Sequence, residues 1–211
     1  MIDSKIEDYS EKHSSDHSNI LNELYRETNL KMVHPRMISG KQQGRFLSML
    51  SHMIRPKTIL EIGTYTGYSA ICLSEGLAEN GKIHTIELDP ELESIASKYF
   101  KKAAVENQII QYFGNALKII PELDLLFDLV FIDADKNNYS NYYNLVFDKI
   151  RSGGFLLADN VLWSGKVIEP IKKGDKDTPG IIEFNTLVQQ DDRVENVLLP
   201  LRDGLMLIRK K

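Results

Sequence analysis

Short apolar runs alternate with amphipathic segments along most of the chain. The apolar runs have the length of buried strands and mostly end at a glycine or an acidic residue. They are residues 57–63, 82–89, 109–114, 127–135 and 153–160. Apolar residues at helical spacing predict helices in 16–29, 41–54, 70–78, 90–103 and 139–150, with a short helix ending near Pro121 and another starting at Thr178–Pro179. This alternation predicts an α/β fold with a doubly wound, mostly parallel sheet and helices on both faces.

The C-terminal segment departs from this alternation. Residues 195–211 contain two apolar runs joined through Arg202–Asp203–Gly204, which is typical of a hairpin turn. We therefore predict a seven-stranded sheet that closes with an antiparallel hairpin. The chain length of 211 residues suits a single domain over 1–211, in which residues 1–55 form an N-terminal helical extension.

Composition and charge narrow the classes of protein. Hydrophobic residues make up 42% and charged residues 27%, which is ordinary for a globular protein. The formal net charge of −4 disfavours nucleic acid as the main partner. Cys72 is the only cysteine, so no internal disulfide forms. No segment resembles a secretory signal or reaches the roughly 20 apolar residues of a membrane helix, so we expect a cytoplasmic protein without a membrane partner.

Acidic residues gather where the predicted strands end. Parallel α/β sheets bind ligands at the carboxyl ends of their strands, so the residues that follow each strand are the candidates for a site. These residues are Glu61, Gly63, Glu87, Gly114, Asn115, Asp133, Asp135, Asp159 and Asn160. An acidic edge of this kind suits a cationic ligand, a metal ion or a ribose better than a phosphate.

A glycine loop follows the first strand. Gly63 permits a tight turn and Gly67 opens the next helix, but the spacing matches neither a dinucleotide fingerprint nor a P-loop. Glu87 ends the second strand, where a carboxylate can accept hydrogen bonds from both ribose hydroxyls. The pattern indicates a nucleoside without a bound phosphate. The alternative is that Gly63 is the glycine that any doubly wound protein carries after its first strand.

Oxygen donors converge after the fourth and fifth strands. Asp133, Asp159 and Asn160 would lie on neighbouring strand ends and offer the hard ligands that Mg²⁺, Mn²⁺ or Ca²⁺ prefers. Such a site leaves room for two adjacent hydroxyls of an aromatic ring. Lys136, beside the cation and partly desolvated, should have a lowered pKa and act as a general base. The alternative is that these acids cap helices or form surface ion pairs and that Lys136 is solvated. The five histidines are scattered, which predicts surface or loop positions rather than ligands.

Five segments carry a family resemblance. The sequences LEIGTYTGYSA, TIELDPE, FDLVFIDADKNNYSNYY, ADNVLWSG and LPLRDGLMLIRK resemble the cation-dependent O-methyltransferases of the caffeoyl-CoA and catechol type. These enzymes belong to the class I S-adenosylmethionine-dependent superfamily, which has a Rossmann-like fold. The resemblance runs from the region of Leu30 to the C-terminus and is most specific in DADK, in ADN followed by LW, and in the terminal DG turn.

The resemblance implies roles for individual residues. The implied S-adenosylmethionine contacts are Ser39, Glu61, Gly63, Thr64, Ser69, Glu87, Ala116, Asp133 and Asp135. Asp133, Asp159 and Asn160 would hold a divalent cation, most simply Mg²⁺, and Lys136 with Asp133 would be catalytic. Met37, Trp163 and Ser164 would lie near an aromatic diol substrate, with the polar loop 163–177 shaping its pocket. Trp163 could equally be plain packing, and the tyrosines of 139–143 read as core and interface. The resemblance also implies a homodimer.

Two positions depart from the family pattern, and three rival functions compete with it. Gln43 stands where many members have Glu, and Ser164 stands where plant members have Asn. No N-terminal lysine aligns with the one that plant enzymes use for the acyl-CoA, so the acceptor stays open.

The rivals are a dinucleotide-dependent oxidoreductase, a non-catalytic nucleoside-binding module, and a methyltransferase that modifies RNA or protein. The first lacks its GxGxxG loop, the second would lose the metal acids, and the third usually needs a basic approach surface.

Overall fold

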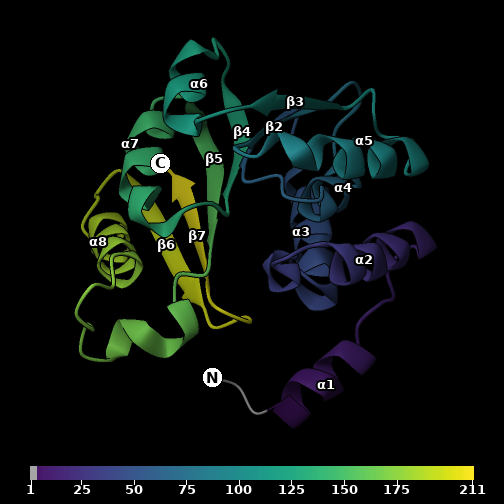
Figure 1. Cartoon of the computed structure of the whole chain (residues 1–211). Helices are drawn as coiled ribbons and strands as arrows, with labels where there is room; N and C mark the ends of the chain where they lie inside the picture. The colour runs from purple at the N-terminus through teal and green to yellow at the C-terminus, as the bar shows by residue number, and fades with distance from the viewer. Residues whose placement is uncertain (1–3) are drawn as a thin grey trace. The chain divides into compact units, whose positions relative to one another are not determined.

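The sheet has the predicted architecture. A computed structural model describes residues 4–211 (Figure 1). Its strands are β1 Thr58–Ile62, β2 Lys82–Glu87, β3 Ile109–Phe113, β4 Phe127–Ile132, β5 Ile150–Asp159, β6 Val194–Leu199 and β7 Leu205–Lys210. They form a seven-stranded sheet in the order β3-β2-β1-β4-β5-β7-β6. The pairings β1–β2, β2–β3 and β4–β5 are parallel, whereas β7 runs antiparallel to β5 and β6. The predicted mostly parallel sheet with a terminal hairpin is therefore confirmed.

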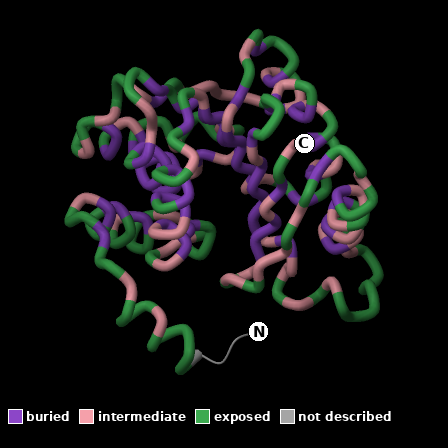
Figure 2. Tube along the Cα trace, turned by 180° about the vertical axis from the view of Figure 1, so that it is seen from behind, coloured by how far each residue is buried: buried purple, intermediate pink, exposed green. Residues whose placement is uncertain are grey.

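The described chain divides into two compact units between Asn115 and Ala116. In the N-terminal unit β1, β2 and β3 are accompanied by helices that pack on one another, α3 against α4 and α2 against α4 and α5. The helices of this unit are α1 Ser4–Lys12, α2 Asn19–Lys31, α3 Lys41–Ile54, α4 Tyr68–Ser74 and α5 Glu93–Lys102, with short 3₁₀ turns at Pro35–Met37 and Pro90–Leu92. Figure 2 shows buried residues along the strands and inner helix faces, whereas α1 is largely exposed.

Local chemistry fixes several helix starts in the N-terminal unit. The Ser18 hydroxyl accepts a hydrogen bond from the backbone N–H of Leu21, at 3.3 Å, and caps α2. The Asp89 carboxylate accepts from the N–H of Glu91, at 2.9 Å, just before Pro90 begins the 3₁₀ turn that leads into α5. The predicted helix over 90–103 therefore begins where the sequence places it, as a 3₁₀ turn at Pro90 that leads into α5.

The C-terminal unit places its helices beside β4, β5, β6 and β7. The helices are α6 Ala116–Glu122, α7 Tyr139–Phe147 and α8 Asp177–Gln189, with 3₁₀ turns at Lys136–Asn138 and Trp163–Ile168. Buried aromatic rings join α7 to α8, because Tyr139 and Tyr143 both make edge contacts with Phe184. The Asp175 carboxylate caps α8 by accepting hydrogen bonds from the N–H groups of Asp177 and Thr178. Of residues 4–211, no helix is both long and apolar enough to cross a membrane.

Several sequence-based expectations need correction. Helix α1 lies in the predicted N-terminal helical extension, but no bounds were predicted for it, because its sequence is polar with few apolar residues. The segment 163–177 is not loop throughout, since Trp163–Ile168 contains short 3₁₀ turns, which a kink with left-handed backbone at Ser164 and Gly165 interrupts. The α7 helix ends at Phe147, and Ile150 already begins β5. His84 is a buried residue of β2, whose ring stacks on Tyr112, rather than a surface or loop residue.

A buried histidine ties the segment between α1 and α2 to α3 and α4. The Nε2 of His17 lies 2.6 Å from the carbonyl oxygen of Lys41, and its Nδ1 lies 3.1 Å from the Tyr68 hydroxyl. A carbonyl only accepts, so Nε2 carries the proton and the neutral ring accepts from Tyr68 at Nδ1. Burial, the largest cause, lowers the pKa of His17 from its ordinary value, and the charge of Arg45 acts in the same direction. The bond to Lys41 and the charge of Glu75 oppose the shift.

This lowered pKa predicts acid sensitivity. The unfolded chain binds a proton at His17 more readily than the folded chain does. The contribution of His17 to the free energy of unfolding is therefore complete above pH 6.5, the ordinary pKa, and is lost as the pH falls through the folded pKa. Urea unfolding at a series of pH values from 7.5 downward should show a smaller acid loss for His17→Gln than for the native chain. His13→Gln, which alters an exposed ring, is the control and should keep the native loss. Equal losses in all three proteins would contradict the assignment.

Candidate functional site

A tight loop follows β1 in the N-terminal unit. Gly63 has a φ of 103° and its N–H donates to the carbonyl of Ile86, at 2.9 Å. The Glu87 carboxylate accepts from the backbone N–H of Tyr65, at 2.7 Å, and from that of Asp89, at 3.0 Å. The parallel register pairs Ile62 with Ile86, which brings Glu87 level with the turn. The glycine loop (residues 63–67) and Glu87 therefore come together as the sequence predicts.

A buried polar network supports the glycine loop. Glu61 is fully buried, and its carboxylate accepts from the hydroxyls of Ser69 and Thr85, each at 2.6 Å. The hydroxyl of Thr64 lies 2.5 Å from that of Thr85. The predicted residues Glu61, Thr64 and Ser69 thus form one network with Thr85. Sequence reasoning missed Thr85, because a threonine inside a strand is ordinary for a β-sheet and carries no signal of its own.

Gly67 cannot carry a side chain without displacing a buried ring. It has a φ of 86° and caps the N-terminus of α4. A Cβ there would lie 2.5 Å from a ring carbon of Phe100, which is itself buried. The predicted role of Gly67 in opening the helix is confirmed. Glycine is needed there both for the left-handed backbone of the turn and because α5 approaches closely.

The remaining predicted contact residues differ in exposure. Ser39 is buried in the segment before α3, whereas Met37, in the preceding 3₁₀ turn, is 57% exposed. Ala116 is the buried first residue of α6. Asp135 is exposed, and its carboxylate accepts from the Tyr142 hydroxyl, at 2.5 Å, and from the Asn138 amide. Asp135 is thus fixed by α7 and the turn before it.

The predicted acids meet at the ends of β4 and β5 in the C-terminal unit. The register pairs Ile132 with Ala158, so Asp133 and Asp159 follow at the same edge of the sheet. Asn160 comes next with a φ of 59°, and its backbone N–H donates to the Asp159 carboxylate, at 2.7 Å. We call Asp133, Lys136, Asp159 and Asn160 the strand-end cluster.

Lys136 occupies the centre of the strand-end cluster. It is 8% exposed, and its Nζ donates to Asp133 Oδ1 at 3.0 Å, to Asn160 Oδ1 at 2.7 Å and to the Tyr139 hydroxyl at 2.8 Å. Each N–H of the ammonium can therefore have an acceptor. The alternative of a solvated surface lysine is wrong.

The protein groups around Lys136 act on its pKa in opposite directions, and the predicted lowering beside a bound cation stays a prediction. Burial acts to lower the pKa of Lys136, but the charge of Asp133 and the hydrogen bonds to Asp133 and Tyr139 outweigh burial and raise the pKa. Sequence reasoning placed a cation beside the amine and overlooked the carboxylate in direct contact with it. The structure shows an ammonium paired with Asp133.

The donor set of the strand-end cluster fits a hard cation. Among the described residues, no group of three or more His, Cys, Asp or Glu side chains could hold a metal ion. The predicted site has two carboxylates and the amide of Asn160. Asparagine is not one of those four residue types, so the predicted site does not count as such a group. Oxygens of Asp133 and Asn160 already converge on one positive charge, the ammonium of Lys136. Carboxylate and amide oxygens are ligands that Mg²⁺ or Ca²⁺ accepts.

The β6–β7 turn fixes the segment that carries Trp163 and Ser164. The N–H of Leu162 donates to the carbonyl of Asp203, at 2.9 Å, and the N–H of Ser164 donates to the Asp203 carboxylate. The ring of Trp163 lies 5.7 Å from Nζ of Lys136. Trp163 therefore borders the strand-end cluster. The sequence marked the turn but gave no indication that Asp203 anchors this segment.

Comparison with known proteins identifies the family. A family model described as O-methyltransferase matches residues 11–211. The chain belongs to the O-methyltransferase family. It is therefore an enzyme, which argues against the rival interpretations as a nicotinamide-dependent oxidoreductase or a non-catalytic module.

The relatives agree with this family. The chain is 33% identical over 201 residues to a caffeoyl-CoA O-methyltransferase of Medicago sativa, covering 88% of this chain and 79% of the relative. The SAH-bound methyltransferase PaMTH1 of Podospora anserina superposes with a TM-score of 0.90 at 28% identity, over 99% of this chain and 94% of that one. An O-methyltransferase of Bacillus cereus in complex with SAH gives 0.90 at 27% identity, over 98% and 97%. The fold is that of S-adenosylmethionine-dependent methyltransferases.

The clash at Gly67 predicts a specific loss of stability. Gly67→Ala should lower the free energy of unfolding by about 1–3 kcal/mol, because the added Cβ must displace the Phe100 ring. Gly174→Ala is the matched control, since Gly174 also has a positive φ of 88° but no atom within 4 Å of an added Cβ. Urea unfolding compares the two. A loss at Gly67 no larger than that at Gly174 would show that the left-handed backbone, rather than the ring contact, requires the glycine.

Proposed function

We propose that this O-methyltransferase moves the methyl group of S-adenosylmethionine to one hydroxyl of a vicinal aromatic diol, with a divalent cation. The strand-end cluster carries the proposal, because it combines hard oxygen donors with a buried ammonium at one edge of the sheet. Two further facts support it. A relative at 33% identity is named a caffeoyl-CoA O-methyltransferase, and similar structures hold SAH, the demethylated form of the donor.

The N-terminal unit would bind the donor. The Glu87 carboxylate, held by the N–H groups of Tyr65 and Asp89, can accept from the ribose hydroxyls. The glycine loop lets the backbone approach the ligand closely. The further donor contacts that we propose in this unit are Ser39, Glu61, Gly63, Thr64 and Ser69. The family resemblance adds Ala116, Asp133 and Asp135, which belong to the C-terminal unit.

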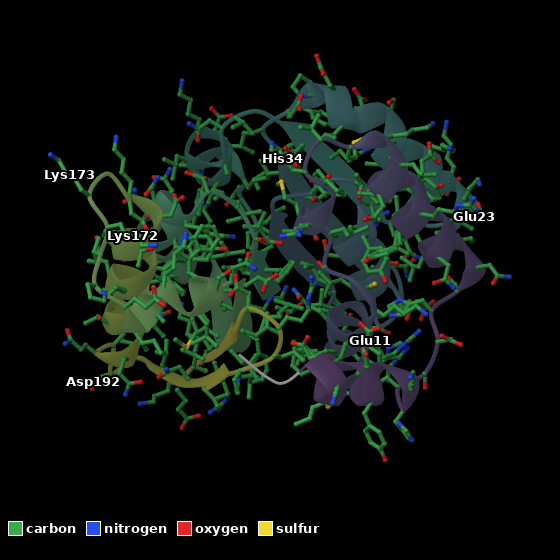
Figure 3. All side chains as sticks on the ribbon, turned by 60° about the horizontal axis from the view of Figure 1, so that its bottom comes forward. Glu11, Glu23, His34, Lys172, Lys173 and Asp192 are labelled. Carbon is green, nitrogen blue, oxygen red and sulfur yellow. The ribbon has the colours of Figure 1, made fainter. Side chains whose placement is uncertain are left out.

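The C-terminal unit would bind the cation and the acceptor. Asp133, Asp159 and Asn160 would hold the cation. When bound, the cation would supply Lewis acidity and offset the carboxylate charge that raises the pKa of Lys136. Trp163 and Ser164 of this unit would contact the acceptor ring, and the family resemblance adds Met37 of the N-terminal unit. The long segment before α8 carries Lys172 and Lys173, whose side chains project away from the ribbon in Figure 3.

Lys136 is the residue that we assign to the proton of the acceptor. The acceptor oxygen attacks the methyl carbon, a new O–C bond forms, and the C–S bond of the sulfonium breaks with its electron pair going to sulfur. For this role Lys136 would first release one proton to solvent, with the bound cation offsetting the charge of Asp133. Its neutral Nζ would then accept the acceptor's proton, and Asp133 would stabilise the ammonium that results. Positioning of the two substrates and the fixed charges of the cluster would supply most of the rate.

The cation requirement is the sharpest test of this function. Methyl transfer from labelled S-adenosylmethionine to catechol should stop with EDTA and return with Mg²⁺ or Mn²⁺. Asp159→Asn should reduce turnover by at least about 100-fold, because it removes a charged ligand while keeping the shape of the side chain. The control is Asp128→Asn, an acid of β4 that pairs with Arg151 instead and should keep native turnover.

Either of two outcomes would contradict the proposal. One is undiminished transfer in EDTA, and the other is native turnover in Asp159→Asn. A panel of catechols with and without a CoA tail would then define the acceptor within the proposed class.

We also propose a homodimer that forms through the N-terminal helices. Large apolar side chains of α1 and α3 are exposed in the chain, among them Tyr9 at 64% and Met53 at 71%. Light scattering should give twice the chain mass of 24.1 kDa. Met49→Lys combined with Met53→Lys should shift the mass toward the monomer, whereas Leu126→Lys, at an exposed apolar site of the other unit, should not. A monomeric native protein would contradict the proposal.

A further inference from the structure

Three buried tyrosines of α7 each place their hydroxyl in a different hydrogen bond. The Tyr143 hydroxyl donates to Asp191, at 2.8 Å, and that of Tyr142 donates to Asp135. The Tyr139 hydroxyl lies in the strand-end cluster. Tyr139 is fully buried and Tyr143 is 1% exposed, so both are core residues of one helix. The sequence predicted the tyrosines of 139–143 as core and interface, but their hydroxyls are not equivalent.

The Tyr139 hydroxyl bridges a strand end and the lysine. It donates to the backbone carbonyl of Asp159, at 2.9 Å, and accepts from Nζ of Lys136, at 2.8 Å. The carbonyl can only accept, so the proton of the hydroxyl points to Asp159 and a lone pair faces Lys136. The ring is fixed by an edge contact with Phe184, at 5.5 Å between centroids. The orientation of the hydroxyl is therefore set by the core.

The backbone of Lys136 is held as firmly as its ammonium. A Cβ at Gly180 of α8 would lie 2.8 Å from the Lys136 carbonyl oxygen, so α8 packs directly on this turn. The flexible stem of a lysine still allows many rotamers, and ordering it costs entropy. Asp133 and Asn160 are the two acceptors that a cation would share. Tyr139 is the remaining acceptor, and it is not a proposed ligand.

We propose that Tyr139 is a positioning residue that holds Nζ of Lys136 at the strand-end cluster for the reaction. The proposal rests on the proposed function, because Lys136 is assigned there to the acceptor's proton. Tyr139 acts through the lysine and does not touch the substrate. Its hydroxyl keeps the amine in place while Asp133 and Asn160 engage the cation.

The first experiment follows the lysine directly and needs no activity. A buried ammonium with three acceptors exchanges its protons slowly, so Nζ of Lys136 should give a ¹H–¹⁵N NMR signal in the full chain treated with EDTA. Loss of that signal in Lys136→Met assigns it. Tyr139→Phe should broaden or abolish the signal, whereas Tyr143→Phe should leave it in place. An unchanged signal in Tyr139→Phe would overturn the proposal.

The second experiment measures the consequence for turnover. Tyr139→Phe should lower kcat about 10- to 100-fold, as a misplacement of about 1 Å does, with the KM for S-adenosylmethionine within about threefold of native. Tyr143→Phe should keep native kcat. In the Lys136→Met background, Tyr139→Phe should cause no further loss, because the group that it positions is absent.

The outcomes separate failure of this inference from failure of the proposed function. Equal losses of kcat from Tyr139→Phe in both backgrounds would show an effect through the fold and overturn the positioning role. Native kcat in Tyr139→Phe would overturn it as well. Native kcat in Lys136→Met would instead refute the proposed role of the lysine, while the NMR signal still reports whether Tyr139 holds it. Thermal unfolding of each variant checks that the chain remains folded.

Discussion

The buried ammonium of Lys136 is the interaction on which the chemistry of this protein depends. A charge in the interior is costly unless acceptors surround it, and this one has a carboxylate, an amide oxygen and a phenol. Meeting that requirement fixes the ends of β4 and β5 and the start of α7 together. The side chains proposed to bind a cation are thereby held in place by the group proposed to receive the proton.

Much of the fold and the site follows from parallel-sheet geometry alone. Residues that end adjacent parallel strands share an edge, so the order of apolar runs was enough to bring Asp133 beside Asp159 and Glu87 beside the glycine loop. The turn at Gly63 and the helix start at Gly67 also follow from local sequence, because both need backbone conformations that glycine adopts easily.

The remainder depends on tertiary contacts that leave no local pattern. Thr85 and Tyr139 look like an ordinary strand residue and an ordinary core residue, yet their hydroxyls complete the networks around Glu61 and Lys136. The raised pKa of Lys136 among the protein groups could not be predicted for the same reason, since it depends on which neighbour lies 3.0 Å away. The bounds of α1 were missed because a polar, exposed helix has few apolar residues to mark its inner face.

The central claim is that the strand-end cluster is a cation site that serves methyl transfer. Anomalous scattering from crystals grown with Mn²⁺, SAH and a catechol tests it most directly. The account predicts an anomalous peak within coordination distance of oxygens from Asp133, Asp159 and Asn160, with both catechol oxygens on the same ion. A fully occupied Mn²⁺ elsewhere, with Lys136 still bonded to Asp133 and Asn160 beside a bound catechol, would contradict it.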